Sequence, residues 1–236
     1  MLRRDAIRLL AGLPALAALP ARAQSAAPVK IATVGAGHIG GTLGALWIKA
    51  GHPVMFSSRH PDELKDMAAG LGPLAHTGTV AEGIAFADVV LLAVPYAALK
   101  AIGEEFAKQL ATKALILDAS NPIVPRDGDL ATWAREKGAG LATAELLPGA
   151  KIVRAFNAIG YMKLKEDSAG PGANIGMPMA GDDQGAIALA STLVHEAGLQ
   201  PVVVGPLTMG KYLIPGTPLA GEHSPDEIRQ IVAGLK

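Results

Sequence analysis

Apolar runs alternate along the chain with longer stretches in which apolar positions recur at helical spacing, from residue 29 to residue 205. The apolar runs predict buried strands, namely VKIATV (29–34), PVMFSS (53–58), ADVVLLAVP (87–95), KALILDAS (113–120), KIVRAFN (151–157), NIGMPMAG (174–181) and QPVVVG (200–205). The stretches between them predict helices, of which the clearest are GTLGALWIKAG (41–51), AALKAIGEEFAKQL (97–110) and DDQGAIALASTLVHEAGL (182–199). Pro61, Asp62 and Glu63 supply the proline and the acidic residues typical of a first helical turn.

This alternation of strands and helices predicts an α/β fold built on a doubly wound sheet with mostly parallel strands. Half of the residues are hydrophobic and only 4% are aromatic, a composition that suits helices packed closely on a buried parallel sheet. A length of 236 residues fits one large domain. We assign this domain to residues 29–205, after a short linker at residues 24–28, and interpret residues 206–236 as a short irregular C-terminal extension.

The first segment, residues 1–23, is predicted to be a cleaved export signal. It has a basic start, an apolar run from Leu9 to Leu19 and the small-x-small pattern Ala21-Arg22-Ala23. The adjacent Arg3 and Arg4 resemble a twin-arginine signal, which predicts an exported, periplasmic protein. Because the apolar run is too short to span a bilayer, no stable membrane span is expected. The alternative is an uncleaved amphipathic anchor.

Charge and residue types exclude several classes of function. The formal net charge is zero, which argues against a nucleic-acid partner. The absence of cysteine fits an oxidising compartment. The six histidines are scattered along the sequence, so no metal site is expected. The sequence also lacks the spacing of a Ser-His-Asp triad or of a G-x-S-x-G nucleophile, and it identifies no catalytic residue.

A glycine-rich turn follows the first predicted strand. Gly35, Gly37 and Gly40 form a G-x-G-x-x-G pattern between that strand and a predicted helix. In a dinucleotide site the first glycine permits the tight turn, the second lets a pyrophosphate approach the backbone, and the third lets the helix pack on the strand. The start of the helix would direct free amides and a positive dipole end at that phosphate. The alternative is a glycine turn that packs without a ligand.

The end of the second predicted strand carries Ser57, Ser58 and Arg59. Many dinucleotide sites have a carboxylate here, which accepts hydrogen bonds from the adenosine ribose of NAD. Two hydroxyls and a planar cation suit the 2′-phosphate of NADP instead, and Lys65 adds a further charge on the following helix. The sequence therefore predicts NADP(H) as the cofactor. The alternative is that Arg59 is only a solvated residue at the start of a loop.

Several motifs together resemble one known family, the NADP oxidoreductases that work with the deazaflavin coenzyme F420. The resemblance covers about residues 29–213. It rests on a series of motifs in the order IATVGAGHIGGTLG, FSSRHPDEL, VVLLAVPYAAL, DASNPI, VRAFNAIG, MAGDD and GPL. The resemblance implies a Rossmann-type NADP-binding fold in which hydride passes directly between two stacked rings.

The resemblance also implies which residues touch the cofactor. Backbone amides of the glycine turn would lie against the pyrophosphate, namely those of Ala36, His38 and Ile39. Ser58 and Arg59 would hold the 2′-phosphate. Residues after the later strands would border the ribose, the nicotinamide and the second substrate, namely Val94, Pro95, Asn121, Asn157 and Ala158. For the two asparagines the alternative is a purely structural role in closing loop backbone bonds.

The expected function is hydride transfer between NADPH and a small, flat redox acceptor, with coenzyme F420 as the co-substrate that the resemblance suggests. A homodimer is also compatible with the resemblance. One alternative is a non-catalytic NADP-binding module. Another is an enzyme of the pyrroline-5-carboxylate reductase type, but those enzymes carry a long helical dimerisation domain for which this chain is too short.

Overall fold

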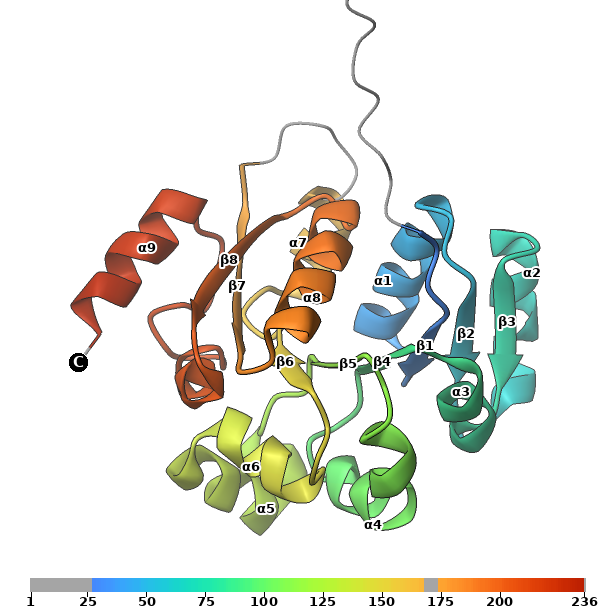
Figure 1. Ribbon diagram of the computed structural model, residues 1–236, viewed down its shortest axis with the longest axis horizontal. Helices are drawn as coiled ribbons and strands as arrows, with labels where there is room; N and C mark the ends of the chain where they lie inside the picture. The colour runs from blue at the N-terminus through green and yellow to red at the C-terminus, as the bar shows by residue number, and fades with distance from the viewer. Residues whose placement is uncertain (1–26, 168–173, 236) are drawn as a thin grey trace, which may run out of the picture.

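The computed structural model describes residues 27–167 and 174–235, which form one eight-stranded sheet with helices on both faces (Figure 1). The predicted export signal, residues 1–23, lies outside the described residues. The strand order is β3-β2-β1-β4-β5-β6-β7-β8. This is the 3-2-1-4-5-6 order of a Rossmann-type sheet with two more strands at one edge. The predicted α/β, doubly wound fold is therefore confirmed.

Seven of the eight strands lie within the predicted apolar runs; six of these are shorter than predicted, and β8 has the predicted bounds. Their bounds are β1 Ile31–Val34, β2 Val54–Ser57, β3 Ala75–Gly78, β4 Val89–Leu92, β5 Leu115–Asp118, β6 Ile152–Arg154, β7 Gly176–Gly181 and β8 Gln200–Gly205. Neighbouring strands are parallel, except that β6 and β7 pair antiparallel. The strands from β1 to β6 therefore end at the same side of the sheet, which we call the carboxyl edge.

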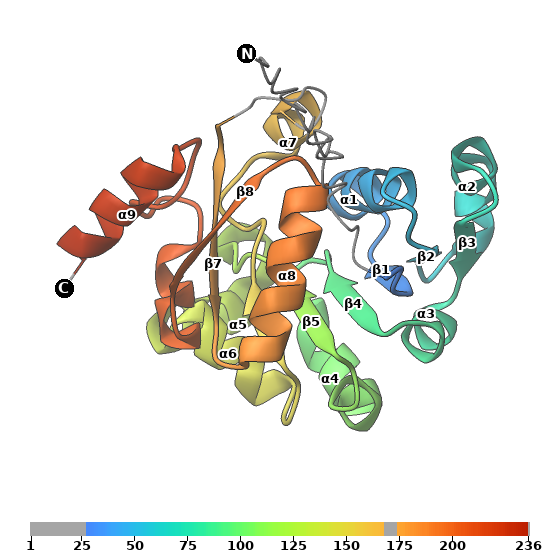
Figure 2. The ribbon, with the colours of Figure 1, turned by 45° about the horizontal axis from the view of Figure 1, so that its top comes forward.

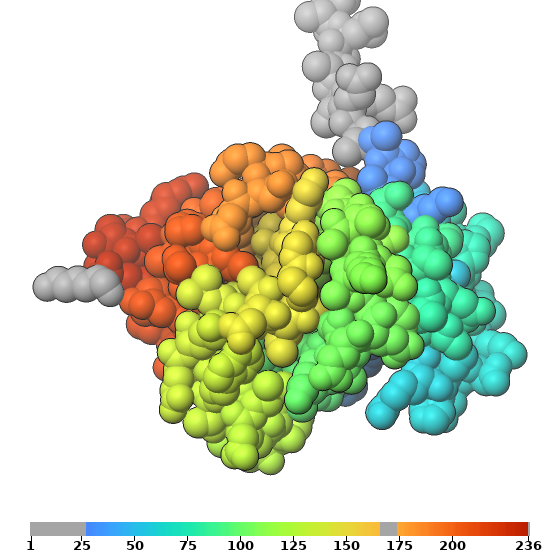
Figure 3. All heavy atoms as spheres, turned by 60° about the horizontal axis from the view of Figure 1, so that its bottom comes forward, coloured from blue at the N-terminus to red at the C-terminus, as the bar shows by residue number. Residues whose placement is uncertain are grey.

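The helices form two layers around the sheet. One face carries α1 His38–Lys49, α2 Lys65–Leu71, α7 Tyr161–Asp167 and α8 Gln184–Glu196 (Figure 2). The other face carries α3 Val80–Phe86, α4 Ala98–Leu110, α5 Val124–Lys137 and α6 Ala139–Leu146. Figure 3 shows the molecule from the side on which α4, α5 and α6 lie.

Alternating side chains of the strands pack into these two layers. In β4, Val89 and Leu91 belong to the hydrophobic cluster under α1 and α8. Val90 and Leu92 belong to the cluster under α3 and α4. All four side chains are fully buried. A parallel strand covered on both faces is expected to be apolar throughout, which is why the sequence shows these strands as continuous apolar runs.

One strand was not predicted. β3 has the sequence AHTG, in which two polar residues and a glycine leave no apolar run. It is an edge strand that pairs only with β2, so an apolar sequence is not required there. A short 3₁₀ helix, Pro61–Leu64, stands where the sequence predicts the first turn of a helix, and α2 follows it directly.

The C-terminal extension packs on the sheet. It contains a 3₁₀ helix, η2 Leu207–Tyr212, and α9 Pro225–Gly234. The side chain of Ser224 accepts a hydrogen bond from the Glu227 backbone, and the Glu227 side chain accepts one in return, a capping box. Ile228 of α9 is fully buried in a third hydrophobic cluster with residues of β7 and β8. The extension therefore packs against β7 and β8 through its own hydrophobic cluster.

Within residues 27–167 and 174–235, no helix is long and apolar enough to cross a bilayer. In the same part of the chain, no group of three or more His, Asp or Glu side chains is placed to hold a metal ion.

Candidate functional site

The glycine turn joins β1 to α1 at the carboxyl edge. Gly35 has φ +93°, and a Cβ there would lie 2.4 Å from the carbonyl oxygen of Ala93. A Cβ at Gly40 would lie 1.9 Å from the carbonyl oxygen of Gly35. Both positions therefore require glycine. Gly37 is exposed, and a Cβ there would have nothing within 4 Å. No protein atom explains Gly37, the second glycine of the pattern, and open space above it is what a close-lying ligand needs.

The N-terminus of α1 is free to receive an anion. Gly37 is the N-cap residue, and no side chain caps the helix. The first turn holds no acidic residue. The first backbone amides of α1, which include those of His38 and Ile39, therefore keep unsatisfied donors and a positive dipole end at the carboxyl edge. These are the amides that the sequence analysis placed against a pyrophosphate.

The end of β2 lies directly beside the glycine turn, because the Gly35 amide donates to the Ser57 carbonyl oxygen at 3.0 Å. The Ser57 side chain is fully buried. A Cβ at Gly83 of α3 would lie 1.9 Å from the Ser57 Oγ, so this hydroxyl points into the layer under α3. This position corrects the prediction that the Ser57 hydroxyl faces a phosphate.

Ser58 and Arg59 remain available at the surface. The Ser58 side chain is half-buried, and its Oγ accepts a hydrogen bond from the His60 amide at 3.0 Å, which leaves the hydroxyl proton free to donate. Arg59 is exposed, and its guanidinium has no ion pair or hydrogen bond in the described part of the chain. Lys65 pairs instead with Asp62 at 2.6 Å. Arg59 is therefore the available cation at the end of β2.

Val94 and Pro95 follow β4 on the other side of the glycine turn. A Cβ at Gly35 would lie 3.0 Å from the Val94 side chain, which places Val94 against the turn. Val94 is half-buried and Pro95 is exposed. The topology changes direction between β1 and β4, and ligands of such sheets bind in the crevice at this point.

The two predicted asparagines lie together beyond β5 and β6. The Asn121 Nδ2 donates to the Asn157 carbonyl oxygen at 2.8 Å. The Asn157 Nδ2 donates to the Ser120 carbonyl oxygen at 2.9 Å. Asn157 is only 3% exposed. Ala158 is also buried, and its carbonyl oxygen accepts a hydrogen bond from the Gly221 amide at 2.8 Å, so the C-terminal extension reaches this corner of the edge.

A buried ion pair, which was not predicted from the sequence, lies beside the two asparagines. Asp118 ends β5, Arg154 ends β6, and both side chains are fully buried. Arg154 Nη1 donates to the Asp118 carboxylate, and Arg154 Nη2 donates to the Ser120 carbonyl oxygen at 3.0 Å. The signal in the sequence was a charged residue inside each of two apolar runs, LILDAS and KIVRAFN.

Hydroxyl groups complete this buried network. Thr143 Oγ1 donates to the Asp118 carboxylate at 2.8 Å, and the Tyr96 hydroxyl lies 3.1 Å from Thr143 Oγ1. Burial raises the pKa of Tyr96 to about 12, even though the hydrogen bond with Thr143 lowers it. Tyr96 therefore stays neutral at ordinary pH. The network runs from the start of α4 to the loop that carries Asn121.

An aromatic pair crosses from the glycine turn to α7. The rings of His38 and Tyr161 are stacked, with centroids 4.1 Å apart and an interplanar angle of 12°. Tyr161 is 40% exposed. From the sequence, only the backbone of His38 was predicted to lie at the site. The stack brings the segment that starts with Asn157 over the start of α1.

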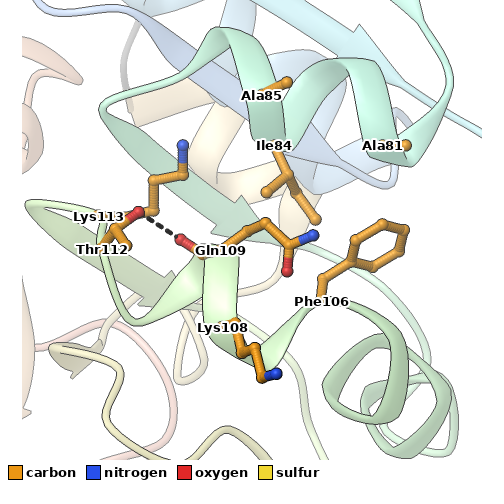
Figure 4. A pocket seen from close by; sticks show the side chains of 8 residues that line it. All are labelled: Ala81, Ile84, Ala85, Phe106, Lys108, Gln109, Thr112 and Lys113. Carbon is orange, nitrogen blue, oxygen red and sulfur yellow. Dashed lines mark hydrogen bonds between the residues drawn. The ribbon is translucent and has the colours of Figure 1, made fainter.

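A hollow of about 340 Å³ lies elsewhere, between α3 and the C-terminal half of α4 (Figure 4). Its lining is mostly apolar and includes Ile84 and Phe106. Lys113, at its rim, precedes β5 and donates to the carbonyl oxygen of Ala87, which precedes β4. The hollow is therefore at the amino ends of the strands, away from the glycine turn.

Comparison with known proteins supports the family resemblance. Residues 30–122 match the family model described as NADP oxidoreductase, coenzyme F420-dependent. The matched range runs from β1 to the loop that carries Asn121, so it contains the glycine turn and the end of β2. Among curated proteins no significant match was found.

Solved structures share the fold. A candidate F420-dependent NADP reductase from Arthrobacter sp. FB24 has a TM-score of 0.65 and 23% identity, and the alignment covers 78% of this chain and 87% of that one. A hypothetical protein from Sinorhizobium meliloti has a TM-score of 0.61 and 26% identity, over 85% and 97% of the two chains. A pyrroline-5-carboxylate reductase from Coxiella burnetii has a TM-score of 0.55 and 20% identity, over 88% of this chain but 63% of that one.

Proposed function

We propose, from the match of residues 30–122 to the family model of the F420-dependent NADP oxidoreductases, that the chain binds NADP(H) along the carboxyl edge and catalyses hydride transfer. The acceptor would be a small, flat redox molecule, and a deazaflavin such as coenzyme F420 is the first to test. The family supports NADP(H) and an oxidoreductase. The identity of the acceptor belongs to the proposal.

One observation carries the proposal, the unpaired guanidinium of Arg59 beside the glycine turn. The hydrogen bond between the Gly35 amide and the Ser57 carbonyl oxygen places the end of β2, two residues before Arg59, beside the glycine turn. Arg59 is exposed, and nearby carboxylates do not neutralise it, because Asp62 pairs with Lys65. A planar cation with a neighbouring hydroxyl donor suits the extra phosphate of NADP, whereas NAD offers that position only hydroxyl groups.

Residues along the carboxyl edge support binding of each part of the cofactor. The uncapped start of α1 would receive the pyrophosphate, and the open space at Gly37 would admit it. Val94 and Pro95 would flank the ribose, and Asn121 and Asn157 would border the nicotinamide. NADPH, when bound, supplies the hydride. The chain would contribute orientation and the exclusion of water more than acid–base chemistry, since the two asparagine amides are neutral.

A test of turnover separates an enzyme from a binding module. The purified chain is incubated with NADPH and, in separate reactions, with a deazaflavin, a flavin and a quinone, and the loss of nicotinamide absorbance is followed. We expect oxidation of NADPH that depends on one of these acceptors. NADPH that binds but is not oxidised with any acceptor would favour the non-catalytic module. Failure of NADPH to bind would refute the proposal itself.

We also propose that the chain is exported and acts in the periplasm. The support is the basic start, short apolar run and small-x-small pattern of residues 1–23. Expression of the full chain in a bacterium, followed by fractionation and sequencing of the mature N-terminus, tests this. We expect periplasmic protein that begins at Gln24. Replacement of both Arg3 and Arg4 by lysine should abolish the periplasmic fraction if the twin-arginine route is used.

A further inference from the structure

The side-chain amides of Asn121 and Asn157 each have one end fixed and one end free. Their nitrogens face the carbonyl oxygens of Asn157 and Ser120, at 2.8 and 2.9 Å. A carbonyl oxygen can only accept, so the NH₂ end of each amide must lie there and the orientation is determined. The other end of each amide is the Oδ1 atom. Both Oδ1 atoms are buried and have no hydrogen-bond partner among the described residues.

It is unusual for two neighbouring residues of a fold to have buried hydrogen-bond acceptors that receive no hydrogen bond. Most buried polar atoms in folded proteins have a partner, and an exception calls for an explanation. The backbone around this pair is also held away from its preferred geometry. Phe156, directly before Asn157, has φ 64° although it is not glycine. Strain of this kind concentrates at functional sites, where the surrounding structure maintains it.

The surroundings hold the pair firmly. The Ser120 carbonyl oxygen accepts from both Asn157 Nδ2 and Arg154 Nη2. Arg154 is in turn bound to the fully buried Asp118. The two free oxygens are therefore attached to a network of hydrogen bonds and a buried ion pair, on the β5–β6 part of the carboxyl edge, away from Arg59 at the end of β2. This is where the sheet topology and the proposed function place the nicotinamide ring.

We infer that the Oδ1 atoms of Asn121 and Asn157 accept hydrogen bonds from the carboxamide NH₂ of the nicotinamide. The inference rests on the proposed function and assigns these two side chains a role in it. A carboxamide nitrogen carries two N–H donors, and the site presents two acceptors. Both acceptors are closed off from solvent, so binding of the carboxamide would require the residues that cover them to move aside. Fixing the carboxamide fixes the rotation of the ring, and with it the face that is presented to an acceptor.

The experiment compares two nucleotides that differ only in this group. NADP⁺ carries the carboxamide, and its 3-acetylpyridine analogue carries a methyl ketone with no N–H donor. The dissociation constants of both for the full-length chain are measured by calorimetry. We expect the wild-type chain to bind NADP⁺ about three- to tenfold more tightly than the analogue, the effect of losing hydrogen bonds to buried neutral acceptors.

The variants Asn121→Ala and Asn157→Ala test the residues themselves. In each, the ratio of the two dissociation constants should fall toward one. The ratio is the informative quantity, because any general weakening of the site affects both nucleotides equally. Asn174→Ala is the matched control, since Asn174 is exposed and precedes β7, and it should keep the wild-type ratio. Asn121→Ala alone decides the matter if Asn157→Ala does not fold.

The outcomes separate this inference from the proposed function. A third ligand, 2′-phospho-ADP-ribose, carries the phosphates without the nicotinamide. If it and NADP⁺ both bind but the analogue binds as tightly as NADP⁺, or if neither alanine variant changes the ratio, the inference is wrong and the cofactor site stands. If none of the three ligands binds, the proposed function fails and the inference fails with it.

Discussion

Two stretches at the carboxyl edge use polar residues in opposite ways. At the end of β2, Arg59 is exposed and unpaired in the described chain, and Ser58 keeps a free hydroxyl proton. At the ends of β5 and β6, Asp118 and Arg154 are fully buried and joined to each other. The first stretch leaves a positive charge exposed at the surface. In the second stretch the two charges pair with each other inside the fold, and the groups left without a partner beside them include two neutral amide oxygens.

The two stretches differ in how far their structure depends on distant parts of the chain. The β2 stretch is local, since three consecutive residues and one turn define it. The β5–β6 stretch joins residues that are 36 positions apart in the sequence. Substitutions at the end of β2 should therefore alter ligand affinity and leave folding intact, whereas substitutions in the buried network should alter folding first.

The largest effect is expected from Asp118→Ala. It leaves the fully buried guanidinium of Arg154 without its carboxylate, and removal of one partner from a buried pair costs about 3–5 kcal/mol. The free energy of unfolding, measured by urea denaturation, should fall by that amount. The double variant Asp118→Leu with Arg154→Met should regain much of the loss, because no unpaired charge remains.

A matched exposed pair provides the control for that experiment. Asp62 and Lys65 pair at 2.6 Å, but both side chains are mostly exposed. Asp62→Ala should leave the midpoint of unfolding unchanged, since exposed pairs contribute little. An equal loss of stability in Asp62→Ala and Asp118→Ala would show that burial does not distinguish the two pairs.

The next effect concerns affinity. Arg59→Asp removes a cation and adds a repelling carboxylate at the end of β2. A hydrogen bond to a charged group is worth about 1.5–3 kcal/mol, and with the added repulsion we expect NADP⁺ to bind about a hundredfold more weakly. Titration by calorimetry measures this, and NAD⁺ affinity should not fall in parallel.

The control variant for this charge reversal is Arg229→Asp. Arg229 is an exposed arginine in α9, at the opposite end of the sheet from β2. The variant Arg229→Asp changes the net charge by the same amount as Arg59→Asp and should leave NADP⁺ affinity unchanged. If Arg59→Asp and Arg229→Asp weakened binding equally, the phosphate assignment of Arg59 would be wrong.

A pH effect probes the buried network again. The pKa of Tyr96 is raised from 10.0 to about 12, mainly by burial. The folded state therefore holds this proton when the unfolded state has lost it, so the contribution of Tyr96 to stability is complete below pH 10 and is lost between pH 10 and 12. Over that range the free energy of unfolding should fall by about 2 kcal/mol more in the wild type than in Tyr96→Phe. Parallel curves for the two proteins would contradict this.

The parts of the fold that depend on local sequence patterns were mostly predicted from the sequence. Continuous apolar runs located β1, β4 and β5, since a strand buried on both faces must be apolar throughout. The spacing of Gly35, Gly37 and Gly40 located the turn. β3 was missed because an edge strand with the sequence AHTG needs no apolar run.

Contacts between distant segments could not be predicted in the same way. Asp118 and Arg154 each stood in an apolar run, but only the parallel pairing of β5 with β6 brings them opposite each other. The sequence placed Asn121 and Asn157 near the nicotinamide by resemblance alone. Their hydrogen bonds join segments 36 and 37 positions apart in the sequence, and Phe156, directly before Asn157, has the positive φ of 64° that no sequence pattern indicated.

The smallest predicted effect compares two neighbouring serines that the sequence treated alike. Ser57→Ala removes a buried hydroxyl that has no hydrogen-bond partner within the described chain. Loss of such a group should leave both NADP⁺ affinity and the free energy of unfolding nearly unchanged, or raise stability slightly. Ser58→Ala removes a half-buried hydroxyl next to Arg59 in the sequence whose proton is free to donate, and one lost hydrogen bond to a phosphate should weaken NADP⁺ binding about threefold to tenfold. Calorimetric titration of both variants decides the question. Because a strand directs successive side chains to opposite faces, equal effects at the two positions would mean that the end of β2 is not oriented as described.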